Sequence, residues 1–90
     1  MSKIYVFIFN NLYMKMKEVR TTLFSERVKE LRIERGLTQA QLASKLGFNR
    51  GTVGDWETRG KEPSFITLCD IASLFDVTID YLLGYSDVND

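Results

Sequence analysis

The chain has 90 residues with twelve basic and twelve acidic side chains, so it is one small domain with a formal net charge of zero. It contains a single cysteine, Cys69, and no histidine, which excludes an intrachain disulfide and a metal site built from cysteine and histidine. Since a glycine-rich phosphate loop and a carboxylate dyad are also missing from the sequence, we expect no enzyme activity, no metal, no cofactor and a reducing, cytoplasmic setting.

The charges are unevenly distributed along the chain. Between Arg27 and Lys61 there are eight basic and four acidic residues, whereas the segment from Glu62 to the end has six acidic residues and no basic one. A domain with a basic end can orient itself toward a polyanion such as DNA. Ordinary solvated surface charge would give the same count, so this distribution alone does not decide between the two.

Residues 1–23 form an extension that differs from the rest. Its six residues from Ile4 to Phe9 are β-branched or aromatic, which favours a β-strand, and the run is too short to cross a membrane. Three interpretations remain open: a strand that pairs with its copy in a second chain, a strand that pairs within the chain or covers a groove, or an extension without consequence ahead of a functional start at Met14 or Met16. An unpaired strand of this composition would promote aggregation.

The first predicted helix covers Ser25 to Arg35. Ser25 is a suitable N-cap, Val28 and Leu31 lie on one apolar stripe, and Gly36 can end the helix. This helix is the expected start of the folded domain, which we place at residues 24–85, followed by a polar tail at residues 86–90.

The second predicted helix has the clearest start and end signals in the chain. Thr38 and Gln41 form a Thr-x-x-Gln capping box, and Leu37 and Leu42 flank it as a hydrophobic staple. Gly47 follows the apolar run, where a residue in the left-handed conformation commonly ends a helix.

A third predicted helix begins almost at once. Asn49 is its expected N-cap, with Phe48 and Val53 as the staple pair. Two helices this short with so brief a turn between them fit a helix-turn-helix, a motif that lays its second helix in the major groove of DNA.

Two further helices complete an all-α domain of five short helices. The fourth starts after Pro63 with Ser64 as its cap, and Cys69 should be a half-buried thiol within it. The fifth starts at Thr78 and ends at Gly84. The residues of the fourth helix that we expect to face the core are Phe65, Leu68, Ile71, Ala72 and Phe75.

The span from Phe24 to Tyr85 resembles the phage-repressor and Cro type of helix-turn-helix domain. The resemblance implies a lambda-repressor-like fold of five helices and covers about two thirds of the chain. It rests on the opening of the second helix (Leu37-Thr38-Gln39-Ala40-Gln41-Leu42-Ala43), the turn at Gly47, Trp56-Glu57, Pro63-Ser64, and the final helix (Val77-Thr78-Ile79-Asp80-Tyr81-Leu82-Leu83-Gly84).

The resemblance also implies roles for individual residues. Arg32 and Glu57 match a pair that forms an internal ion pair in relatives, so Arg32 should not contact DNA. Gln39 lies at the position where members of this family contact a DNA phosphate. The full set of DNA-binding residues that we predict is Thr38, Gln39, Asn49, Arg50, Gly51, Thr52, Asp55 and Arg59.

The outward face of the third helix departs from the family pattern. On a helical wheel Val53 and Trp56 face inward, while Gly51 and Gly54 face outward without a side chain, and each glycine disfavours a helix by roughly 1 kcal/mol relative to alanine. Arg50 can bind the O6 and N7 atoms of guanine, and an aspartate at position 55 can accept from a cytosine amino group but repels phosphate. Specificity would then rest on DNA shape or close backbone approach, or the DNA-binding role is weakened.

The sequence therefore predicts a DNA-binding transcriptional regulator, a repressor by resemblance. We expect it to bind double-stranded DNA with an inverted repeat as a homodimer, through the helix around Arg50–Glu57, with no membrane and no small-molecule ligand involved. The alternative is a protein-interaction module, such as an antitoxin-like or anti-regulator partner, that keeps the helix-turn-helix as a scaffold.

Overall fold

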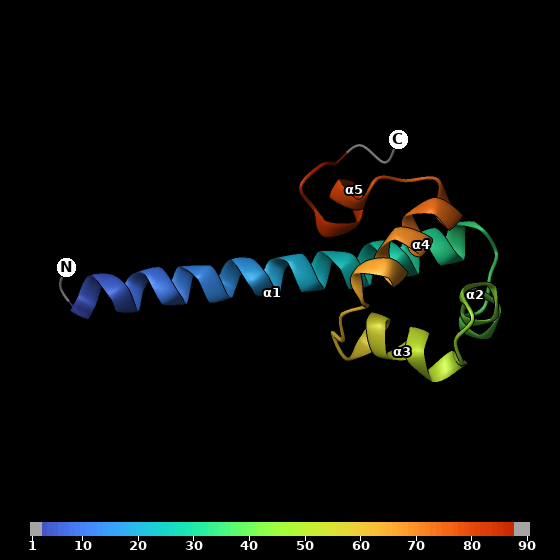
Figure 1. The fold of residues 1–90 in the computed structure, drawn as a ribbon, viewed down its shortest axis with the longest axis horizontal. Helices are drawn as coiled ribbons and strands as arrows, with labels where there is room; N and C mark the ends of the chain where they lie inside the picture. The colour runs from blue at the N-terminus through green and yellow to red at the C-terminus, as the bar shows by residue number, and fades with distance from the viewer. Residues whose placement is uncertain (1–2, 88–90) are drawn as a thin grey trace.

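The computed structural model of the chain is all α-helical, as the sequence predicts, and describes the backbone of residues 3–87, with side chains at Leu12 and from Lys15 onward. A long first helix projects from a body in which the other helices surround its C-terminal half (Figure 1). The helices of the described part are α1 (Lys3–Glu34), α2 (Gln39–Leu46), α3 (Arg50–Thr58), α4 (Phe65–Phe75) and α5 (Ile79–Leu83).

α1 corrects two predictions made from the sequence. It is one helix of 32 residues, so the backbone of residues 4–9 is helical and not a strand, and the helix does not begin at Ser25. The sequence before Gly36 contains no glycine or proline that would interrupt this helix. A strand would also need a neighbouring strand for its backbone hydrogen bonds, and the described part of the chain has none. Inside the helix, the Ser25 hydroxyl lies within hydrogen-bond distance of the carbonyl oxygens of Thr21 (3.1 Å) and Trp56 (2.6 Å), so its one hydrogen is shared between them and does not cap a helix.

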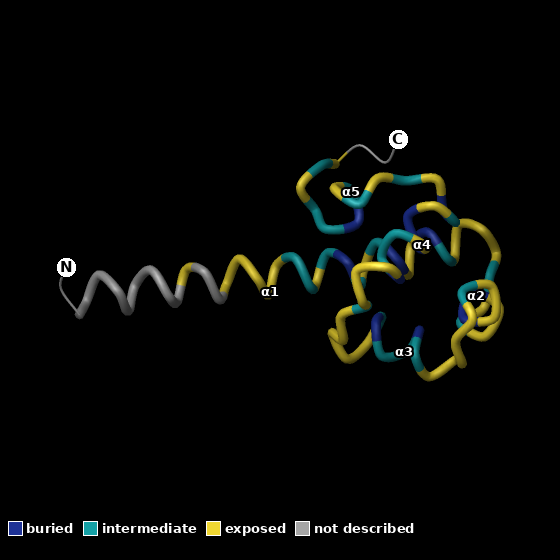
Figure 2. The backbone as a smooth tube through the Cα atoms, viewed as in Figure 1, coloured by how far each residue is buried: buried dark blue, intermediate teal, exposed yellow. Residues whose placement is uncertain are grey.

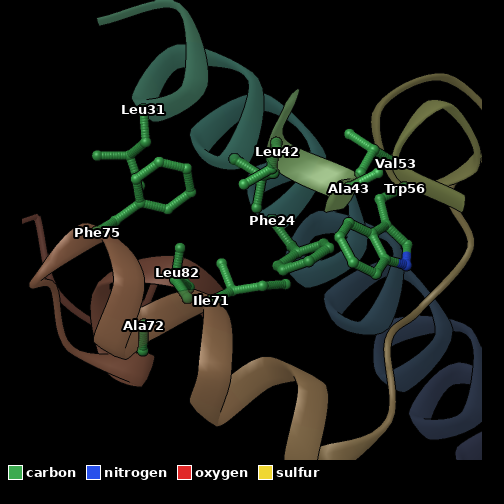
Figure 3. Packing of buried hydrophobic residues seen from close by; sticks show 11 residues of the cluster. Phe24, Leu31, Leu42, Ala43, Val53, Trp56, Ile71, Ala72, Phe75 and Leu82 are labelled. Atoms are coloured by element: carbon green, nitrogen blue, oxygen red, sulfur yellow. The ribbon is translucent and has the colours of Figure 1, made fainter. Parts of the chain in front are cut away.

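One hydrophobic core joins all five helices (Figures 2 and 3). Phe65, which the helical spacing assigns to this core, is 73% exposed, because it is the first residue of α4 and lies a turn beyond the core-facing positions. Cys69 is half-buried, as predicted. The buried apolar residues are Phe24, Val28, Leu31, Leu42, Ala43, Val53, Trp56, Ile71, Ala72, Phe75 and Leu82.

The helix ends follow the predicted caps. Thr38 and Gln41 form both hydrogen bonds of the capping box, and Asn49 accepts a hydrogen bond from the backbone N–H of the third residue of its helix. Ser64 and Thr78 cap α4 and α5 in the same way. These local signals set where each short helix begins, and core packing then holds the helices together.

Three arginines fasten α1 to α4 and α5. Arg20 Nη1 donates to the carbonyl of Gly84 (2.7 Å), and Arg35 Nη2 donates to the carbonyl of Phe75 (2.8 Å), which ends α4. Arg27 donates to the carbonyl oxygens of Tyr81 and Ser86. Arg27 and Arg35 belong to the basic span of the sequence, and in the structure their guanidinium groups hydrogen-bond to backbone carbonyls of α5, α4 and the segment after α5.

We predict that replacing Gly84 by alanine destabilises the fold through close packing between α1 and α5. Gly84 has φ +80°, and an added Cβ would overlap Leu23 Cδ1 and lie 3.3 Å from Leu23 Cβ. The matched control is Gly36→Ala, at φ +68° with no atom within 4 Å of an added Cβ, which isolates the backbone strain. Urea unfolding should show a loss for Gly84→Ala that exceeds the control by about 1–3 kcal/mol, and equal losses would contradict the role of packing.

Candidate nucleic-acid interface

α2 and α3 form a helix-turn-helix in which the second helix is held by two buried side chains. Val53 and Trp56 of α3 enter the core, as the helical wheel predicts (Figure 3). The Trp56 ring packs edge-to-face against Phe24 of α1, with ring centres 6.5 Å apart, and against Phe48 of the turn at 5.8 Å. These contacts fix the side of α3 that faces inward and thereby the side that faces solvent.

A buried ion pair ties α1 to the end of α3. Arg32 Nε and Nη2 donate to the two carboxylate oxygens of Glu57 at 2.7 and 2.9 Å, and the side chains are only 12% and 1% exposed. Arg32 Nη1 also donates to the carbonyl of Leu37, just before α2. The hydrogen bonds that Arg32 donates to Glu57 raise the pKa of Arg32 above its usual value, so this guanidinium stays charged despite its burial.

The same carboxylate positions Gln39, the first residue of α2. Gln39 Nε2 donates to Glu57 Oε1 at 3.2 Å, which draws the amide over the surface of α3. A Cβ added at Gly54 would lie 3.8 Å from Gln39 Oε1, so this glycine faces the amide. The sequence predicts that Gly54 faces outward without a side chain. In the structure this glycine borders the Gln39 side chain.

The start of α3 carries the residues that could contact DNA bases. Arg50 and Gly51 are exposed, and Asn49 Oδ1 accepts from both the backbone N–H (3.1 Å) and the hydroxyl (3.2 Å) of Thr52. Arg50 is thus the one long side chain at the N-terminal end of α3. The neighbouring Asn49 and Thr52 are already hydrogen-bonded to each other.

Asp55 and Arg59 lie one turn apart further along the helix. Arg59 Nε is 3.6 Å from Asp55 Oδ1, an ion pair between partly exposed side chains that stabilises the helix little. The arginine still lowers the local negative potential of the aspartate, which reduces the repulsion of phosphate expected from Asp55 alone.

The structure brings the predicted residues to α2 and α3 but gives several of them internal partners. Thr38 accepts from Gln41, and Gln39 is half-buried against Glu57. Two exposed lysines that the sequence marks only as part of the basic span also belong to this region: Lys45 in the last turn of α2 and Lys61 after α3. No spacing motif in the sequence singles out either lysine.

In the described part of the chain, cysteine and acidic side chains form no group of three that could hold a metal ion. None of the helices that the structure describes is long and apolar enough to cross a membrane.

The comparisons with known proteins agree with this geometry. The sequence profile of the helix-turn-helix family matches residues 28–82, more than half of the chain, and the chain belongs to this family in its Cro/C1-type form. Because members of this family regulate transcription, the prediction that the chain is not an enzyme is confirmed.

Individual relatives support the same assignment. The chain is 37% identical over 72% of its length to the uncharacterized HTH-type transcriptional regulator YobD of Bacillus subtilis, and 30% identical over 74% to the cryptic phage CTXphi transcriptional repressor RstR of Vibrio cholerae. It spans 58% and 60% of these two proteins. The restriction-modification controller protein C.AhdI of Aeromonas hydrophila is similar in structure, with a TM-score of 0.61, 31% identity, and coverage of 69% of this chain and 94% of C.AhdI.

We predict that Glu57→Ala destabilises the protein far more than Glu30→Ala, which removes an exposed carboxylate from α1. Loss of Glu57 leaves Arg32 charged and buried without its counter-ion, which costs about 3–5 kcal/mol. Thermal unfolding of the two variants should show the difference, and similar midpoints would contradict a structural role for the pair.

Proposed function

We propose that the chain is a sequence-specific DNA-binding transcriptional regulator, in particular a repressor, that binds an inverted-repeat operator as a dimer. The observation that carries this proposal is the exposed N-terminal end of α3, where Arg50 faces solvent while Val53 and Trp56 are buried. In helix-turn-helix proteins this end of the second helix contacts base edges. The similarity to proteins named as transcriptional regulators and repressors supports the same function.

Each residue has a distinct proposed role. Arg50 reads a guanine through its O6 and N7 atoms, and Asp55 accepts from a cytosine amino group with Arg59 beside it. Gln39, oriented by Glu57, donates to a phosphate. Four further residues border the backbone of the DNA: Thr38, Asn49, Gly51 and Thr52.

The glycine-rich face favours recognition with few base contacts. Gly51 is exposed and Gly54 lies against Gln39, so neither glycine adds a side chain to the base contacts proposed for Arg50 and Asp55. The absence of side chains lets the helix backbone approach the DNA closely, and the shape of the groove then adds to specificity. A dimer on two half-sites one helical turn apart compensates for the small number of base contacts in each.

We predict that the purified protein binds a duplex selected from a random pool, and that binding weakens steeply as salt rises. Arg50→Ala should lower the affinity for that duplex by about 1–3 kcal/mol and relax the preference at one base pair. Gln39→Ala should weaken binding about equally on all sequences. The control is Lys29→Ala, which removes an exposed base from α1 and should leave the affinity nearly unchanged.

Two outcomes of this titration would count against the proposal. Equal losses for Arg50→Ala on selected and random DNA would remove its base-reading role. A folded protein that enriches no duplex at low salt would favour the alternative, a protein-interaction module on a helix-turn-helix scaffold.

A further inference from the structure

A groove lies along the middle of α1, between this helix, the start of α4 and the end of α5. It has a volume of about 390 Å³, which is within the range of sites for small molecules, about 300–1,000 Å³. The residues that α1 contributes to the lining are spaced three and four positions apart, so they form one face of the helix. The rest of the lining comes from the segment before α4, from α4 itself, and from the end of α5 with the residues after it.

The lining of the groove is mainly apolar. Phe24 belongs to the hydrophobic core, Leu68 and Leu83 are half-buried, and Met16 is 53% exposed. Pro63 completes this apolar wall. A wall of this kind binds the hydrocarbon part of a ligand, because burying both surfaces removes apolar area from water.

Two cationic side chains line the same groove without a carboxylate partner. Lys17 and Arg20 lie one turn apart on α1, and the three ion pairs found among the described residues involve other side chains. The acidic residue of the lining, Glu62, accepts a hydrogen bond from the Thr21 hydroxyl at 3.2 Å. With two basic residues and one acidic residue the lining is net positive, which favours an anionic ligand.

Arg20 has a hydrogen-bond donor that no described residue uses. Its Nη1 donates to the carbonyl of Gly84 at 2.7 Å, and its Cζ lies 4.1 Å from the centre of the Tyr85 ring. Its Nε is the only buried side-chain nitrogen or oxygen in the described part of the chain that lacks a hydrogen-bond partner. Because buried donors are nearly always paired, an unpaired donor beside a groove points to an acceptor supplied by a ligand.

Arg32, on the same helix, shows which acceptor suits this arrangement. Its Nη1 also donates to a backbone carbonyl, that of Leu37, while its Nε and Nη2 donate to the two oxygens of the Glu57 carboxylate. Arg20 uses Nη1 in the same way, but its Nε has no carboxylate. Since the Nε side of a guanidinium matches the geometry of a carboxylate, this is the group that we expect Arg20 to bind.

We propose that the groove binds a small amphipathic carboxylate, a molecule with one carboxylate group and a hydrocarbon tail. The carboxylate binds between Lys17 and the Nε side of Arg20, and the tail lies along the apolar wall. Tyr85, which stacks on the guanidinium and is 68% exposed, turns aside to admit the carboxylate to Nε. The sequence does not indicate this ligand, because the groove forms only when residues 16–24 pack beside residues 62–85.

The first test is calorimetric titration of the full chain with octanoate, without DNA and below the concentration at which octanoate forms micelles. Octanoate should bind with one molecule per chain. Octanol has the same tail without the charge, and acetate has the charge without the tail, so each should bind roughly tenfold or more weakly. A folded chain that binds no octanoate, or that binds octanol equally well, would overturn the proposal.

The second test compares two charge reversals on α1. Lys17→Glu should raise the dissociation constant of octanoate roughly fivefold or more, because a repulsion replaces an attraction at the carboxylate. The matched control is Lys29→Glu, which reverses an exposed lysine of the same helix that does not line the groove and should change the constant little. Both lysines are exposed, so both variants should keep the circular dichroism spectrum of the parent. Equal changes in the two dissociation constants would contradict binding at the groove.

A third measurement locates the ligand on the parent chain and therefore does not depend on any variant. When octanoate is added, the amide chemical shifts that change most should belong to residues 16–24, 62–68 and 83–85. Changes that are scattered over the surface, or centred on α2 and α3, would overturn the assignment to the groove. Because DNA is absent from all three measurements, they decide the ligand site independently of the proposed function.

Discussion

The buried ion pair between Arg32 and Glu57 is the constraint on which the rest of the structure depends. Its two hydrogen bonds join the C-terminal half of α1 to the last turn of α3, and the third nitrogen of Arg32 holds the chain before α2. One guanidinium thus fixes three helices relative to one another. Because both side chains are almost fully removed from water, the pair tolerates only one arrangement of these helices.

The ion pair connects the core to the proposed DNA-binding surface. Glu57 also accepts from Gln39, so the residue that stabilises the fold orients the side chain proposed to meet a phosphate. Trp56, its neighbour, sets the rotation of α3 through two aromatic contacts. With α3 packed in this way, Gly54 borders Gln39, and Arg50 is exposed at the start of the helix.

The sequence predicts best those features that depend on local chemistry. The caps at Thr38, Asn49, Ser64 and Thr78 lie within three residues of their partners, and all four are present. The sequence is less informative about a side chain whose hydrogen-bond acceptor lies far away along the chain. Arg27 and Arg35 look like surface charges in the sequence, but their acceptors lie at least 40 residues away along the chain. Nothing in the spacing indicates those contacts.

The strand prediction at Ile4–Phe9 is wrong for a related reason. Six β-branched and aromatic residues satisfy a strand pattern, but secondary structure also depends on the neighbouring residues, and the helix-forming segment from Leu12 to Glu18 leads without interruption into the core helix. The sequence and the family resemblance indicate which residues of α2 and α3 form the candidate DNA-binding site. They do not indicate that Gly54 borders Gln39, because that contact exists only once the two helices are packed.

The most direct test of the organising role of the ion pair is a double-mutant cycle, with Arg32→Met, Glu57→Met and the combined variant unfolded in urea. We predict that each single substitution leaves a buried charge unpaired and destabilises strongly, whereas the double variant recovers much of the loss, with a coupling free energy of about 2 kcal/mol or more. Losses that simply add, with a coupling near zero, would contradict the claim that this pair organises the fold.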